Sequence, residues 1–130
     1  MPNLNLFITA KDQQTIAFAL VSHIEQNLSS PPTADDLQLK TQYESIIQNL
    51  MARQPLSDQE IREVYLSLFI VKSVINGDLA PKSFSFKRRM ASHSKDIRRV
   101  FRKFNNAFLE LGWPVLTPED IQSPNDTPQL

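Results

Sequence analysis

Apolar residues recur at intervals of three or four in four stretches of the chain, which is the spacing that lines one face of an α-helix. These stretches predict helices over about residues 11–28, 34–53, 57–76 and 95–111. Residues 83–94 are expected to add a short helical turn before the last of them. Convincing strand pairs are absent. The pattern therefore predicts an all-α protein.

Residues that favour helix ends stand at the borders of these stretches. The sequence predicts N-caps at Thr9, Thr33, Ser57 and Ser94. Ser57 and Glu60 have the spacing of a capping box, and Gly77 and Gly112 stand where helices end. Because the connections are short, we expect a compact antiparallel bundle of four main helices with short flanking turns.

The predicted helix over residues 57–76 is apolar on nearly every side from Val64 onward. Such a helix either lies at the centre of its domain or packs against another subunit. We assign residues 1–117 to a single helical-bundle domain. Residues 118–130 are expected to form a short turn and a flexible C-terminal tail.

The chain carries 14 basic and 14 acidic side chains, but their distribution is uneven. Residues 1–81 hold five basic and nine acidic side chains, and residues 82–103 hold nine basic and one acidic. Residues 104–130 hold four acidic side chains and no Lys or Arg. A uniformly solvated surface does not need this segregation. The basic stretch, residues 87–103, is therefore the first candidate for a functional surface.

Helical geometry gives the last predicted helix two faces. At about 100° per residue, its apolar residues fall within roughly 60° of Ile97 and its basic residues fall on the opposite side. We expect the cations of the basic stretch to form one outward-facing surface that binds nucleic acid: Lys87, Arg88, Arg89, Lys95, Arg98, Arg99, Arg102 and Lys103.

Two basic pairs in this helix stand four residues apart, namely Arg98 with Arg102 and Arg99 with Lys103. Without a compensating acid, each pair costs a few tenths of a kcal/mol. Arg forms bidentate contacts with phosphate, so we expect binding to RNA or DNA phosphates without sequence specificity. This requires that the cations are not neutralised by their own chain. The alternatives are a merely solvated face, pairing with the acidic N-terminal part, or an acidic protein or membrane partner.

The sequence offers little for catalysis or for a metal. There is no Cys, and the only two His residues are His23, expected at the boundary of a helix core, and His93, expected near a helix start. Acidic residues cluster at predicted helix N-termini, where the helix dipole accounts for them. We therefore expect no enzyme activity, no cofactor and no metal. Phe84 and Phe86 flank the basic stretch and are expected to be buried, with base stacking as the alternative.

The first residues, MPNLNLFITAKD, have no basic region before their apolar residues and make a poor secretory signal. The longest apolar stretch, around residues 64–71, is far shorter than the ~20 residues of a membrane helix. We therefore expect a soluble cytoplasmic protein without a membrane partner.

A small, Cys-free, all-helical chain with one basic face resembles the small helical subunits of CRISPR effector (Cascade-type) complexes. The resemblance covers size, helicity, the apolar third helix and the basic stretch, and it includes no motif. It implies an antiviral-defence role in a ribonucleoprotein, where copies of the subunit contact RNA and DNA backbones and other subunits without catalysis. The eight cations named above would then carry the backbone contacts.

The architecture also resembles that of bacteriocin immunity proteins, which are small helical bundles with a mobile C-terminal tail. That resemblance implies a protein-binding module, and a phage or transcriptional adaptor is a further protein-binding alternative.

Overall fold

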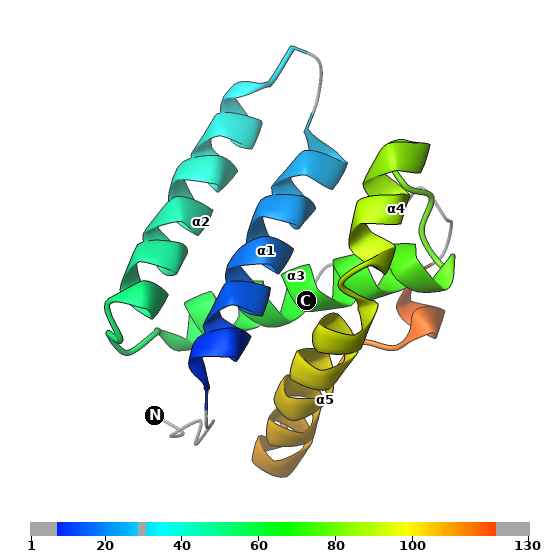
Figure 1. The fold of residues 1–130 in the computed structure, drawn as a ribbon. Helices are drawn as coiled ribbons and strands as arrows, with labels where there is room; N and C mark the ends of the chain where they lie inside the picture. The colour runs from blue at the N-terminus through cyan, green and yellow to red at the C-terminus, as the bar shows by residue number, and fades with distance from the viewer. Residues whose placement is uncertain (1–7, 29–30, 122–130) are drawn as a thin grey trace.

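The structure is a computed structural model that describes residues 8–28 and 31–121 (Figure 1). In order, its elements are α1 (Ala10–Asn27), α2 (Ala34–Met51), α3 (Asp58–Asn76), α4 (Phe84–Ala91), α5 (Ser94–Leu111) and the 3-10 helix η1 (Pro118–Asp120). The described residues contain no strand, so the predicted all-α class is confirmed. The short turn predicted after residue 117 is η1, whereas residues 122–130 of the predicted tail lie outside the described residues.

The helix ends follow the predicted chemistry with one exception. Capping boxes begin α1, α2 and α3, with Thr9, Thr33 and Ser57 as the N-caps. Gly77 and Gly112 follow α3 and α5 with φ of 83° and 72°, a conformation that glycine adopts without steric cost. The exception is Ser94, which is the first residue of α5 and not its cap; His93 takes that position without a capping side chain.

The helix α3 lies at the centre of the fold. Figure 1 shows α1 and α2 as antiparallel neighbours, with α3 running across behind α1. α3 contacts α1, α4 and α5, so its apolar surface is covered by its own chain. Its buried apolar residues are Val64, Tyr65, Leu68, Phe69, Ile70, Val71 and Val74. Of the two roles predicted for this helix, the structure shows the central one.

Aromatic packing between α3 and α5 fixes which side of α5 faces the core. Tyr65 stacks on Phe101 and Phe108, with ring centroids 5.3 and 4.3 Å apart. The Tyr65 hydroxyl donates to Asn105 Oδ1 at 2.8 Å and accepts from the backbone N–H of Leu116 at 2.9 Å. These contacts hold α5 and the following segment against α3.

A buried polar network joins α1, α2 and α3. His23 is 3% exposed, so the prediction that it lies at the boundary of the core is wrong. Its Nδ1 lies 3.0 Å from Ser67 Oγ and 3.0 Å from the Tyr43 hydroxyl, which donates to Glu63 Oε2 at 2.8 Å. Burial lowers the pKa of His23 to about 4. Because Ser67 and Tyr43 are fully buried, the imidazole of His23 is held in the interior of the fold.

Candidate nucleic-acid interface

The cations of the basic stretch are positioned by two helices that both contact α3. On α4, Phe86 and Met90 are buried in the core. On α5, Ile97, Val100 and Phe104 are buried in the same core. Because side chains on a helix turn by about 100° per residue, basic residues between these apolar positions point to the side or away from the core.

Three of the eight cations are neutralised by acids of the same chain. Arg89 forms an ion pair with Glu25 of α1 at 2.8 Å. Arg99 and Lys103 both reach Asp12 of α1, at 2.9 and 2.6 Å. For these three, the expectation of a cation left unneutralised by its own chain is wrong. The alternative of pairing with the acidic N-terminal part holds instead, because both acidic partners, Glu25 and Asp12, lie on α1.

Asp12 is the centre of this pairing. Its side chain is 1% exposed, and it also accepts from the backbone N–H of Thr9 at 3.1 Å as part of the capping box of α1. Burial alone would raise the pKa of Asp12. Hydrogen bonds from Lys103, the Thr9 backbone and Arg99 outweigh burial and lower the pKa from 3.8 to about 2. The carboxylate therefore fastens the start of α1 to the middle of α5.

Replacing Asp12 with Asn is expected to lower the free energy of unfolding at pH 7 by about 2 kcal/mol. Because the folded pKa lies below the unfolded value, this stability is present above about pH 4 and is lost as the pH falls towards 2. Urea unfolding at pH 7 measures the difference. Asp35→Asn, an exposed change in the first turn of α2, is the matched control and should cost less than about 0.5 kcal/mol. Equal losses in the two variants would contradict the role of Asp12.

The other five cations form what we call the outer ridge: Lys87, Arg88, Lys95, Arg98 and Arg102. All five side chains are exposed, and none forms an ion pair with an acid within residues 8–28 and 31–121. Arg98 donates to the side-chain oxygen of Asn76 at 2.7 Å, which orients the guanidinium without neutralising it. Arg88 lies near the ring of Phe84, with 5.9 Å from its guanidinium carbon to the ring centroid.

On α5, Lys95 and Arg102 of the outer ridge are spaced by seven residues, which changes the direction of a helical side chain by only ~20°. Arg98 lies next to this line, one turn before Arg102. Between Lys95 and Arg102 the helix rises by about 10 Å, whereas Lys87 and Arg88 lie on the separate helix α4, which ends at Ala91. The duplex repeat is 3.4 Å per phosphate of each strand, so the ridge is long enough to meet several phosphates.

The aromatic residues that flank the basic stretch have different surroundings. Phe86 is buried, as predicted, whereas Phe84 is 75% exposed, so the prediction of burial is wrong for Phe84. Phe84 is the first residue of α4, before the buried face of that helix begins. His93 stacks on Phe18 of α1 with ring centroids 3.9 Å apart, which gives it a packing role at the junction of α4 and α5.

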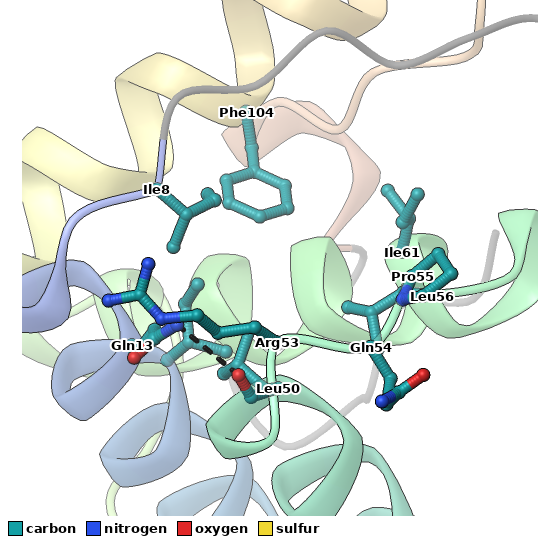
Figure 2. Close-up of a pocket in the computed structure, with 10 residues that line it drawn as sticks. Ile8, Gln13, Leu50, Arg53, Gln54, Pro55, Leu56, Ile61 and Phe104 are labelled. Carbon is teal, nitrogen blue, oxygen red and sulfur yellow. Dashed lines mark hydrogen bonds between the residues drawn. The ribbon is translucent and has the colours of Figure 1, made fainter.

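A pocket of about 480 Å³ lies on another part of the molecule (Figure 2). Apolar side chains such as Ile16, Leu56 and Phe104 form most of its lining. Gln13 crosses from α1 to donate to the backbone carbonyl of Leu50 at 3.2 Å. Arg53 is the one charged residue of the described lining, and no acid, base or nucleophile is grouped there. The pocket therefore supplies no catalytic constellation.

Other kinds of site find no support in the described part of the chain. It contains no group of three His, Cys, Asp or Glu residues that could hold a metal ion. None of its helices has both the length and the apolar character required to span a bilayer. The comparisons of the whole chain with protein-family models, curated proteins and solved structures find no match. The fold and the site define an all-helical protein whose most distinctive surface is the outer ridge.

Proposed function

We propose that the protein is a non-catalytic nucleic-acid-binding protein that contacts phosphates through the outer ridge. The observation that carries the proposal is the exposure of five cations with no acid of the described chain paired to them. Acidic side chains of the same chain neutralise three other cations of the basic stretch, namely Arg89, Arg99 and Lys103. The five cations left unpaired supply the positive surface that a polyanion needs.

The energetics of α5 support the same proposal. Arg99 and Lys103 stand four residues apart, but Asp12 lies between their charges and offsets their repulsion. Arg98 and Arg102 have the same spacing and no acidic partner among the described residues. Their repulsion costs a few tenths of a kcal/mol in the free protein. A phosphate bound between the two guanidinium groups would replace that repulsion with attraction.

Contacts from the outer ridge to phosphates recognise the nucleic-acid backbone and give no specificity for the base sequence. We therefore propose binding to RNA or DNA without sequence specificity. We also propose that the protein is cytoplasmic and acts within a larger ribonucleoprotein, with other subunits or further copies of itself. This wider part of the proposal is supported by the resemblance to CRISPR effector small subunits in size, helicity and the presence of one basic stretch, residues 87–103.

Fluorescence anisotropy with a labelled oligonucleotide at low salt tests the proposal. We expect saturable binding in the micromolar range or tighter, because non-specific binding of this type has Kd values of about 10⁻⁴–10⁻⁶ M at physiological salt and strengthens as salt falls. Poly-glutamate of similar charge is the competitor. Absence of binding at low salt would contradict the proposal, and so would equal affinity for poly-glutamate, which indicates an acidic protein as the partner.

The alternative of a protein-binding module makes a different prediction. If the protein resembles an immunity protein in function, removal of residues 118–130 should abolish activity while alanine substitutions in the outer ridge have no effect. The nucleic-acid proposal expects the reverse: the truncated chain keeps its affinity for the oligonucleotide, and the ridge variants lose it.

A further inference from the structure

The side chain of Phe84 is the most exposed large apolar group in the described residues. Its exposure is 75%, against 58% for Leu109, the next in order. Core packing does not account for it, because Phe86 and Met90 supply the buried face of α4. The exposed ring of Phe84 is therefore a candidate contact for a binding partner.

The surroundings of Phe84 are cationic. Arg88 lies one turn further along α4, with its guanidinium carbon 5.9 Å from the centroid of the Phe84 ring. Lys82 stands before Phe84 in the sequence and Lys87 after it, and both side chains are exposed. None of these three cations forms an ion pair within the described residues. The ring is therefore the apolar element at one end of the outer ridge.

This pairing of a flat apolar ring with neighbouring cations matches the chemistry of a single-stranded nucleic acid. A nucleotide presents a base with a π-face and a phosphate joined to it through the sugar. Sites for single strands combine a positive surface that follows the backbone with aromatic side chains on which bases stack. In a duplex, the faces of internal bases are already covered by their neighbours, so an exposed ring discriminates in favour of a single strand.

We propose that Phe84 stacks on an unpaired base while Lys87 and Arg88 contact the adjoining phosphates. The inference rests on the proposed function and narrows it to single-stranded RNA or DNA. The outer ridge then continues along α5 and guides the strand away from the stacked base. An acidic membrane surface is the competing occupant, because an aromatic ring flanked by cations also suits a lipid headgroup region.

The test compares the full chain with Phe84→Ala, using an oligothymidylate of about 20 nucleotides and a duplex of the same length. Phe84→Ala should weaken single-strand binding by about 5- to 150-fold, which corresponds to ~1–3 kcal/mol for one stacked base. Duplex binding should change by less than about twofold, because phosphate contacts carry it. Phe84→Trp should restore single-strand affinity, and Leu109→Ala, the matched exposed apolar control on α5, should leave it unchanged.

The outcomes separate this inference from the proposed function. If the chain binds both oligonucleotides and Phe84→Ala weakens neither, or weakens both equally, the stacking site is wrong and phosphate binding stands. If the chain binds neither, the proposed function fails as well. Vesicles that contain anionic lipid form the last arm. Vesicle binding that is lost in Phe84→Ala, together with unchanged oligothymidylate binding, would overturn the inference in favour of a membrane.

Discussion

Reversing the charges of Arg98 and Arg102 together should weaken oligonucleotide binding by about 100-fold or more at low salt. A cation about 4 Å from a phosphate gains ~1 kcal/mol in water, and an acid at the same place loses a similar amount. Two reversals therefore remove roughly 3–4 kcal/mol from the binding free energy. Anisotropy titrations of Arg98→Glu/Arg102→Glu against the unchanged protein measure the loss.

A matched variant separates this local effect from net charge. Lys40 and Arg53 are exposed, lie outside the basic stretch and can be reversed to give the same change in net charge. Lys40→Glu/Arg53→Glu should weaken binding several-fold at most, because only long-range attraction is reduced. Circular dichroism should show the same helicity in both variants. Equal losses of affinity would mean that the outer ridge has no special role.

Acidification should destabilise the protein through His23 before it affects any carboxylate. The folded pKa of His23 is about 4 and its ordinary value is 6.5, so the unfolded chain takes up a proton first as the pH falls. The stability contributed by the uncharged imidazole of His23 is therefore fully present above pH 6.5. The free energy of unfolding falls by about 3 kcal/mol by pH 4. The cause is the cost of charging an imidazole that is 3% exposed and held beside Ser67 and Tyr43.

Urea unfolding at pH 7 and pH 4 measures this effect, with His23→Gln as the comparison. Gln cannot titrate in this range but keeps polar atoms near Ser67. We expect the variant to be less stable at pH 7 and to lose much less stability between the two pH values. A loss of about 3 kcal/mol that persists in the variant would assign the acid sensitivity to other groups.

Local sequence rules predicted the helices well, because their signals lie within a few residues of each other. Thr9 with Asp12 and Ser57 with Glu60 are capping pairs at a separation of three, and Thr9, Ser57 and Glu60 behave as predicted. Gly112 ends α5 for an equally local reason. Helix α4 shows the limit of these rules, because the sequence predicted only a short helical turn in its place. Its eight residues carry two buried side chains, too few to establish a helical periodicity.

The pairing of the cations in the candidate surface was not predicted, because it depends on distant segments. Asp12 reaches Arg99 across 87 positions and Lys103 across 91, a contact that no spacing in the basic stretch reveals. One local sign was present: Asp96 lies three residues before Arg99 and pairs with it at 2.6 Å, on the side of α5 that faces α1. Arg98 and Arg102 lie on the other side. Within α5, the packing of α1 decides which cations pair with Asp12 and which belong to the outer ridge.

The salt dependence of oligonucleotide binding is the most direct test of the claim that the outer ridge binds phosphates. Each neutralised phosphate of a single strand contributes about −0.7 to the slope of log K against log salt. Three to five ridge contacts predict a slope of about −2 to −3.5 between about 50 and 200 mM salt. In Arg98→Ala/Arg102→Ala the slope should become shallower by about 1.4. A slope near zero, or one unchanged in this variant, would contradict the account.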